Sequence, residues 1–549
     1  MKKGFTLIEL LAVIVILAII ALIATPIVLN IINDTKESSQ LRSAEFYLDA
    51  VETAIAQSTL NDKKLENKSY NILENGNLCI EYKDNECINE LEVKVSGEVP
   101  SSGSITIENG KIEEIKLKYE NDKIVVYDDN KKIVYGVPEP YQENENIEIP
   151  NLYNNTLTPI IYDGNNWIIA DVTDKWYSYS NQEWANAVIL DSSVKKGIGD
   201  PITVEGTNPD VLAMFVWIPR YEYKIEGTYG KGGTSASNPG EIEVNFVTLD
   251  KKEASEAYIM HPAFNFGGED INGLWVGKFE LSHKTKTSSL GCTNENCEEA
   301  NGLRILPNVQ SLRNNSVSSF FYAIRSMSKF GIDSKLTDPH MIKNSEWGAV
   351  AYLSQSKYGK YGNSDYEGLE KEIYQNKDLY ITGMSNGKPS INTYRDGNGG
   401  QTANNSNTVQ CLYYEIANNC GIGASTTGNI YGIYDMSGGA VEYVMGVLLS
   451  KVGSSGFVNL DQIENKYYDD YPKYGENDLG HAISETSSSG GGDTSWYNDA
   501  SNYLSYSFLV RGGNYKGSKY AGIFYFRVSS SDGSADNDNG TRAVLTPTT

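Results

Sequence analysis

The stretch 1-MKKGFTLIELLAVIVILAIIALIATPIVLN-30 decides how the rest of this chain is organised. No polar residue occurs from Leu10 to Ala24, and a helix continued to Leu29 would be about 30 Å long, enough to cross a bilayer core. A secretory signal would carry small residues in an A-x-A pattern after the apolar run, and 18-AIIALIATP-26 does not supply one. The sequence therefore predicts an apolar helix that stays on the mature protein.

The expected processing point precedes the apolar run, at the junction of Gly4 and Phe5. Cleavage there creates an α-amine on Phe5. Glu9 places a carboxylate near the start of a lipid-soluble segment, where an unpaired charge costs several kcal/mol and is usually functional. The amine of its own helix is only four residues away, so the amine of a neighbouring subunit is the better partner. Glu9 therefore predicts an assembly element.

The residues 2-KKGFTLIE-9 resemble the class III leader of type IV prepilins, and the resemblance covers about residues 1–58. It implies that a prepilin peptidase cuts after Gly4 and methylates Phe5, and that the helix leaves the cytoplasmic membrane to join other pilins at the cell surface. Pro26 fits, because these helices carry a proline at which the helix can kink. An ordinary single-span anchor with an accidental glutamate is the alternative.

Length and charge bound the remaining possibilities. A chain of 549 residues should hold roughly two to four domains with ample buried core. The formal net charge of -25 makes the surface repel phosphate backbones and anionic lipid, which argues against a nucleic-acid partner. With 38 Tyr, 51 Gly and only four His, the composition is more typical of a loop-rich extracellular binding module than of a metalloenzyme.

Six cysteines form three close pairs: Cys79 and Cys87, Cys292 and Cys297, Cys411 and Cys420. Each pair would close a short loop, and an exported protein lies where disulfides persist. A zinc site is the alternative, but the spacings differ from C-x₂-C and no histidine lies close in sequence. If the host exports proteins without oxidation, all six are free thiols.

Periodicity predicts an α+β, multidomain chain. After the membrane segment, Leu41, Ala44, Leu48, Val51 and Ile55 keep a three-four helical spacing. The period then changes to two, and Asn109-Gly110 between two such runs is a strong hairpin signal, so about four antiparallel strands should lie against the helix, as in a pilin head. The expected organisation is a leader at 1–4, a helix at 5–61, a sheet at 62–136, a linker at 137–154 and a large unit at 155–549.

The large unit reads as short aromatic and β-branched strands between Gly/Asn/Ser loops, with one helix-like patch around Ser345–Leu353. Its motifs resemble the formylglycine-generating, or sulfatase-modifying-factor, domain, a variant of the C-type lectin fold, most closely over 430–549. The matching residues are Asn429, Tyr431, Gly432, Asp435, Met436, Ser437, Gly438, Glu442, Arg511, Gly512, Gly513 and Arg542, and the departures are Gly439, Tyr443, Asn514 and Thr541. Glu442 and Arg511 are expected in buried hydrogen-bonded pairs.

No catalytic residue is predicted. In formylglycine-generating enzymes two cysteines bind copper and carry out the thiol chemistry, and the corresponding positions here are Gly517 and Gly522. No H-E-x-x-H, G-x-S-x-G or Gly-rich phosphate loop occurs, and the four histidines stand alone at His261, His283, His340 and His481. An oxidase of the formylglycine-generating type is therefore the less favoured alternative.

An acidic segment, 531-SDGSADNDNGT-541, leaves one cofactor open. Asp532, Asp536 and Asp538 offer oxygen ligands for a structural calcium ion, but the segment lacks the glycine position and terminal glutamate of an EF-hand. A solvated acidic turn is the simpler interpretation, so no metal site is predicted.

The same C-terminal region predicts a display surface. Tyr, Ser and Arg are residue types of adaptable binding sites, and an ordinary loop surface is the alternative. The expected ligand-binding residues are Tyr515, Lys519, Tyr520, Tyr525, Arg527, Ser529 and Ser530. Lectin-fold domains with this R-G-G…G-x-F ending resemble the variable proteins of diversity-generating retroelements, in which adenine-derived codons are scrambled while the fold is kept.

Together these features predict a minor or tip pilin that carries a ligand-binding, adhesin-like domain for an extracellular glycan or protein. The alternative is a pseudopilin that works in a secretion or uptake machine.

Intact-mass analysis of the mature protein tests the leader. Loss of residues 1–4 and the gain of one methyl group on Phe5 are expected, because the peptidase cuts after Gly4 and methylates the new amine. Surface protein that still begins at Met1 would overturn the pilin interpretation.

Overall fold

The computed structural model describes the chain from residue 40 onward with gaps. The residues outside it are 1–39, 62–64, 74, 84–85, 96–97, 120–123, 128–130, 137–139, 154–155, 328–331, 333–334, 386–410, 416–420, 489–490, 493, 504–506, 518–519, 529–531 and 549. Gly4, Phe5, Glu9 and Pro26 therefore lie outside the described residues. None of the helices in the described part is both long and apolar enough to cross a membrane.

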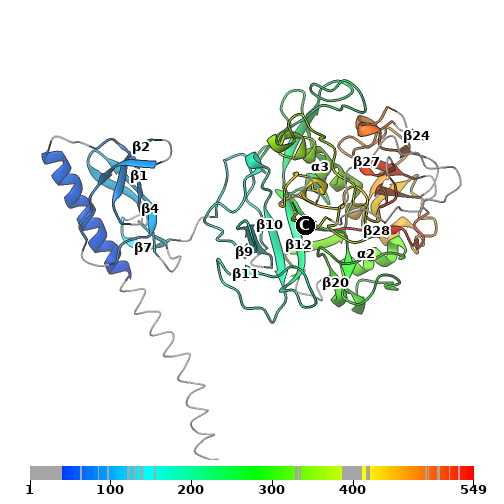
Figure 1. Cartoon of the computed structure of the whole chain (residues 1–549), viewed down its shortest axis with the longest axis horizontal. Coiled ribbons are helices and arrows are strands. Elements are labelled where there is room, and N and C mark those ends of the chain that lie inside the picture. The colour runs from blue at the N-terminus through cyan, green and yellow to red at the C-terminus, as the bar shows by residue number, and fades with distance from the viewer. Residues whose placement is uncertain are drawn as a thin grey trace, which may run out of the picture. The chain divides into compact units, whose positions relative to one another are not determined.

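The chain divides into two compact units, residues 1–139 and 140–549 (Figure 1). Each has its own hydrophobic core. The boundary falls inside the expected linker at 137–154. Residues 140–153 of that segment pack with the second unit, where Ile147 and Tyr153 are buried.

The first unit is an amphipathic helix against a sheet (Figure 1). The helix covers residues 40–60, and its inner face buries Ala44, Leu48 and Val51 within the core of the unit. Phe46 is 61% exposed on the opposite face. The three-four spacing of the apolar residues therefore predicted the buried face correctly, because residues at that spacing share one side of a helix.

The sheet has seven antiparallel strands, in the order β3-β2-β1-β4-β5-β6-β7. They are β1 Lys68–Ile72, β2 Leu78–Lys83, β3 Glu86–Leu91, β4 Ser102–Glu108, β5 Lys111–Lys118, β6 Ile124–Tyr127 and β7 Ile133–Gly136. The expected number of about four was wrong, because several strands have only four to six residues and leave little room for a period of two. The hairpin was predicted correctly: Asn109 and Gly110 join β4 to β5 with φ angles of 51° and 76°.

An eight-stranded sheet forms one half of the second unit, in the order β11-β9-β8-β10-β12-β18-β29-β21. Its strands are β8 Thr158–Tyr162, β9 Trp167–Ile169, β10 Asn186–Leu190, β11 Pro201–Ile202, β12 Val211–Pro219, β18 Gly273–Gly277, β21 Thr337–Met341 and β29 Ala543–Pro547. The last strand of the chain, β29, lies between β18 and β21. The C-terminal segment is therefore part of the sheet interior.

A second sheet, the C-terminal sheet, has the order β23-β22-β26-β27-β25-β24, with β28 also paired to β22. Its strands are β22 Val441–Leu448, β23 Asp469–Tyr471, β24 Gly491–Gly492, β25 Ser501–Asn502, β26 Phe508–Gly512, β27 Gly522–Arg527 and β28 Asn539–Thr541. Smaller sheets join β13 Tyr221–Ile225, β14 Ile242–Phe246 and β15 Ile259–Met260; β16 Asn265–Phe266 and β17 Glu269–Asp270; and β19 Ser282–His283 and β20 Leu303–Arg304.

The helices of the second unit are short. The α-helices are α2 Val317–Arg325 and α3 Asn344–Ser354, and the 3₁₀ turns are η1 Tyr179–Asn181, η2 Pro262–Phe264, η3 Glu298–Gly302, η5 Lys360–Gly362, η6 Ser364–Tyr366, η8 Ile422–Ala424, η9 Leu460–Gln462, η10 Asn465–Tyr467, η11 Ser484–Thr486 and η12 Trp496–Asn498. The helix expected around Ser345–Leu353 is confirmed as α3, and every residue of α3 is buried. The described chain is thus mainly β, with few helices.

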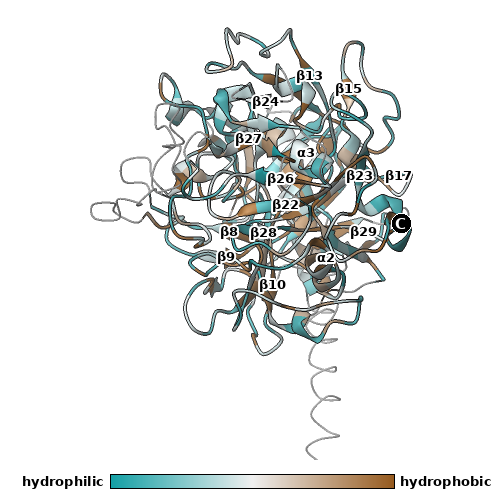
Figure 2. Cartoon of the chain, turned by 90° about the vertical axis from the view of Figure 1, so that its right-hand side faces the viewer, coloured by the Kyte–Doolittle hydropathy of each residue, from teal (hydrophilic) through white to brown (hydrophobic). Residues whose placement is uncertain are grey.

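One continuous core joins these elements and contains all seven tryptophans of the chain. Hydrophobic stretches follow the interior strands, whereas the outer loops are mostly hydrophilic (Figure 2). Gly348 lets α3 lie close to the backbone at Gly480, because a Cβ atom on residue 348 would lie 1.9 Å from the carbonyl oxygen of Gly480. The core therefore holds long loops as well as regular elements.

A pair of helix variants tests the packing of the first unit. Leu48→Ala should lower the free energy of unfolding by about 2–4 kcal/mol, because it empties a buried site, and Phe46→Ala should change it by less than about 0.5 kcal/mol. Urea unfolding of a fragment spanning 40–139 measures both. Equal losses would contradict the assignment of the buried face.

Candidate functional site

Four of the seven expected binding residues are described, and these four lie on one hairpin of the C-terminal sheet, formed by β26, β27 and the loop between them at 513–521. Tyr515 and Tyr520 lie in the loop, and Tyr525 and Arg527 lie on β27. Tyr515 and Tyr525 are buried, whereas Tyr520 and Arg527 are partly exposed. Lys519, Ser529 and Ser530 lie outside the described residues.

Tyr515 belongs to a cluster that we call the Tyr380 cluster, made of Arg313, Tyr380, Tyr515 and Asp538. The rings of Tyr380 and Tyr515 meet edge to face, with centroids 4.7 Å apart, and the Arg313 guanidinium lies 4.2 Å from the Tyr380 centroid. The Tyr380 hydroxyl donates to Asp538. Burial, followed by this hydrogen bond, raises the pKa of Tyr380. The cluster thus joins loops from three distant parts of the chain.

Asn514 and Gly439, two residues that depart from the formylglycine-generating pattern, make contacts at the start of the same loop. Asn514 donates to Asp538 at 3.3 Å and accepts from the Gln375 side chain through its carbonyl oxygen at 2.9 Å. The Tyr515 amide donates to the carbonyl oxygen of Gly439 at 2.8 Å. A Cβ atom on Gly439 would lie 2.4 Å from a carboxylate oxygen of Glu280, so glycine suits this position. Contacts at both Asn514 and Gly439 therefore hold the start of the loop in place.

Glu442 and Arg511 are both fully buried and hydrogen-bonded, but each has a different partner. Arg542 holds Glu442 through two hydrogen bonds, of 2.6 and 3.1 Å, and also donates to the carbonyl oxygen of Gly277 at 2.7 Å. Arg511 donates to the Asn344 side chain at 2.7 Å and to backbone carbonyl oxygens. These groups hold the backbone in place, which is a scaffolding role.

Two further carboxyl groups lie beside this ion pair. Glu280 accepts from the Ala440 amide at 2.8 Å and from the Ser311 hydroxyl, and Asp435 accepts from the Asn376 side chain at 2.9 Å. Burial raises the pKa of Glu280 well above its usual range, and the neighbouring acids raise it further. Burial also raises the pKa of Asp435 to about 6. The cluster therefore retains protons that exposed carboxyl groups would release.

The two positions that hold cysteines in formylglycine-generating enzymes have no room for a side chain here. A Cβ atom on Gly522 would lie 2.1 Å from Oδ1 of Asp499, whose Oδ2 accepts from the Phe524 amide at 3.0 Å. A Cβ atom on Gly517 would lie 2.8 Å from the carbonyl oxygen of Tyr520. Glycine at these positions therefore serves the packing of the loop.

The cysteines and the acidic segment take the following positions. Cys79 is bonded to Cys87 and Cys292 to Cys297; Cys411 is disulfide-bonded, and Cys420 lies outside the described residues. Asp532 accepts from the Ser534 amide, and Asp536 accepts from the Asp538 amide. In the described part of the chain, no three His, Cys, Asp or Glu residues are grouped as metal ligands. A structural calcium ion therefore stays the untested alternative to a solvated acidic turn.

Sequence reasoning missed Arg313, Tyr380 and Glu280, which come from segments with no recognisable motif. Tyr380 lies 158 residues from Asp538 along the chain, so no local spacing connects them. A buried carboxylate also gives no periodic signal in a loop-rich segment. Only the folded chain brings these residues together.

Glu280→Gln tests the protonated cluster. The glutamine oxygen can accept from Ala440 while its amide donates to Ser311. A raised folded-state pKa contributes stability that is full below the unfolded pKa of about 4.5 and is lost as pH rises through the folded value. Between about pH 5 and pH 9, urea unfolding of a 140–549 fragment should show the wild type losing stability relative to the variant, by at most about 1.4 kcal/mol per pH unit.

The exposed substitution Glu253→Gln is the control, and it should leave the pH dependence of the wild type unchanged. Parallel stability curves for the wild type and Glu280→Gln would contradict a raised pKa at Glu280.

Comparison with known proteins identifies the leader. Residues 1–25 match the family described as "Prokaryotic N-terminal methylation motif". No curated protein matches the chain. Among solved structures, the "Major Tropism Determinant I1 Variant" aligns with 78% of this chain and 93% of its own, at 10% identity and a TM-score of 0.24, which is too weak to establish a common fold. The methylation motif indicates a precursor of the type IV pilin or pseudopilin kind, which a prepilin peptidase processes for assembly.

Proposed function

We propose that this chain is a minor or tip type IV pilin that displays a ligand-binding, adhesin-like domain of C-type lectin, sulfatase-modifying-factor-like fold on the cell surface. The observation that carries the proposal is the methylation motif at 1–25, in a chain that otherwise forms two compact units. Cleavage after Gly4 leaves the helix on the mature chain, and Glu9 pairs with the amine of a neighbouring subunit. The helix then serves first as membrane anchor and later as filament contact.

The size of the second unit supports a low copy number. Residues 140–549 form one compact body with a large main core, far larger than the 40–139 part of the first unit. Such a body on every subunit would crowd a helically packed filament. A subunit at the tip, or scattered along the shaft, avoids that crowding.

The hairpin of β26 and β27 supports the ligand-binding role. The Tyr380 cluster and the contacts of Asn514 anchor the first residues of the loop between these strands, 513–517, so exposed side chains there can change while these contacts are kept. Lys516 is exposed and Tyr520 is partly exposed on this loop. A fixed backbone with changeable side chains is what a diversified site for a glycan or protein requires.

A formylglycine-generating oxidase is not part of the proposal, since glycines occupy both cysteine positions and Asp499 fills the space beside Gly522. Incubation with copper and a cysteine-bearing peptide should yield no aldehyde. The pseudopilin alternative rests on the same leader at 1–25 and differs in location, because a pseudopilin works without an extracellular ligand.

Immunogold labelling of intact cells separates these functions. A tag at the C-terminus should appear sparsely on filaments, mainly at tips, and a variant with Gly4→Leu should remain in the membrane because the peptidase cannot cut it. Absence of label on intact cells would favour the pseudopilin, and label at every shaft subunit would contradict a minor pilin.

A binding screen of the 140–549 fragment against glycans and surface proteins then tests the hairpin. Tyr520→Ala combined with Arg527→Ala should weaken a detected interaction about tenfold or more, because aromatic and arginine contacts carry much of the energy of interfaces. Lys195→Ala, an exposed cation outside the hairpin, is the matched control. Equal binding by both variants would remove the hairpin from the site.

A further inference from the structure

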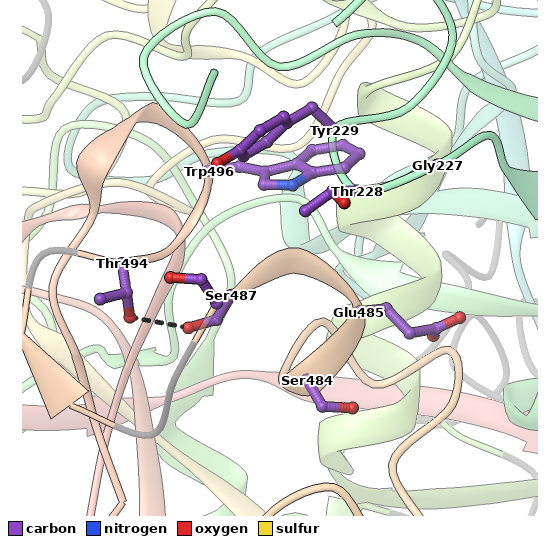
Figure 3. Close-up of a pocket in the computed structure, with 9 residues that line it drawn as sticks. Gly227, Thr228, Tyr229, Ser484, Glu485, Ser487, Thr494 and Trp496 are labelled. Atoms are coloured by element: carbon purple, nitrogen blue, oxygen red, sulfur yellow. Dashed lines mark hydrogen bonds between the residues drawn. The ribbon is translucent and has the colours of Figure 1, made fainter. Parts of the chain in front are cut away.

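A pocket of about 250 Å³ lies in the second unit, and no residue of the β26–β27 hairpin lines it. Its walls come from the loop after β13, from η11 and its flanking residues, and from the start of η12 (Figure 3). Thr228 and Tyr229 belong to the first wall, Glu485 to the second and Trp496 to the third. Two regions distant in sequence, 227–229 and 484–496, thus contribute to one concave site.

Glu485 supplies the charged group of this pocket. Its Oε2 accepts from the Tyr352 hydroxyl at 2.9 Å, from the Gly480 amide at 2.5 Å and from the Tyr223 hydroxyl at 2.9 Å. Among the described residues, Oε1 accepts from the Tyr223 hydroxyl alone, at 3.1 Å. A carboxylate oxygen has two lone pairs for hydrogen bonds, so Oε1 keeps capacity to accept a further hydrogen bond.

In the described part of the chain, no lysine, arginine or histidine forms a salt bridge with Glu485, and Asp478, which has the same sign, acts on it electrostatically. Burial, together with Asp478, raises the pKa of Glu485. A partly buried carboxylate without a cation carries a desolvation cost, and a ligand that brings a positive charge lowers that cost.

The other walls suit a small organic cation. The rings of Tyr229 and Trp496 lie on the same side of the pocket (Figure 3), and aromatic rings attract ammonium groups through their π faces. Hydroxyl groups line the remaining sides, among them Thr228 and the Ser487–Thr494 pair, whose oxygens lie 2.9 Å apart. Hydroxyl oxygens can accept the N–H groups of an ammonium that Glu485 does not take.

From this arrangement we propose that the pocket binds a primary alkylammonium group, with the ammonium on Glu485 and the carbon chain along Tyr229 and Trp496. The group belongs to a lysine side chain or to an amino sugar, both of which present the same chemistry. An anionic ligand would meet a like charge, and a neutral polyol would leave Glu485 unbalanced. This binding goes beyond the proposed pilin function and does not depend on surface display or on the hairpin.

The test uses the full chain in nonionic detergent micelles and saturation-transfer NMR with four probes. Nα-acetyl-lysine methylamide and methyl glucosaminide carry the ammonium, and their N-acetylated derivatives are the neutral counterparts. Saturable binding of at least one ammonium probe is expected, with at least about tenfold weaker binding of its neutral counterpart, since a hydrogen bond to a charged group is lost. The stronger of the two ammonium probes identifies the source.

Two variants locate the site. Glu485→Gln removes the charge and should weaken the ammonium probe at least about tenfold. Thr228→Arg places a competing guanidinium at an exposed position on the rim and should abolish binding without disturbing the hydrogen bonds of Glu485. Thr228→Gln, of similar length without the charge, should retain more binding than Thr228→Arg. Glu253→Gln, which makes the same charge change at an exposed site outside the pocket, should bind as the wild type does.

Three results would each overturn the proposal: no saturable binding of either ammonium probe, equal binding of the neutral counterparts, or unchanged binding by both Glu485→Gln and Thr228→Arg. None of them bears on the pilin proposal, which rests on the leader and on surface labelling.

Discussion

The buried ion pair of Glu442 and Arg542 is the interaction on which the second unit depends. Glu442 lies on β22 of the C-terminal sheet, whereas Arg542 precedes β29 and also donates to Gly277 at the end of β18 in the eight-stranded sheet. The pair therefore couples the two large sheets. Removing two charges from water is costly, and the two parallel hydrogen bonds together with carbonyl acceptors offset that cost.

The same region explains how so much irregular chain is held in place. Glu280 and Asp435 accept from the backbone amides of Ala440 and Gly383, so buried carboxyl groups replace strand pairing where the chain has none. The Tyr380 cluster likewise holds the start of the loop between β26 and β27 through side-chain contacts. Side chains at fixed positions thus define the course of the backbone where strand pairing does not.

Local structure could be predicted from the sequence, whereas contacts between residues far apart along the chain could not. The inner face of the 40–60 helix, the Asn109-Gly110 turn and α3 all follow from spacings of a few residues. The number of strands in the first sheet was missed because several are too short to show alternation. Tyr515 is of a residue type common in binding sites, so the sequence placed it among the ligand-binding residues. In the structure Tyr515 is buried, and Tyr380, far away along the chain, packs against it.

The sequence by itself determined the leader: 1–25 carry a methylation motif that can be recognised from consecutive residues, because a peptidase and a bilayer both act on a continuous segment. Only the tertiary structure decided the pocket at Glu485, whose hydrogen-bond donor Tyr223 lies 262 residues away. The physical reason is the range of the contacts. A helix face repeats every few residues and leaves a pattern, whereas a carboxylate paired across the fold leaves none.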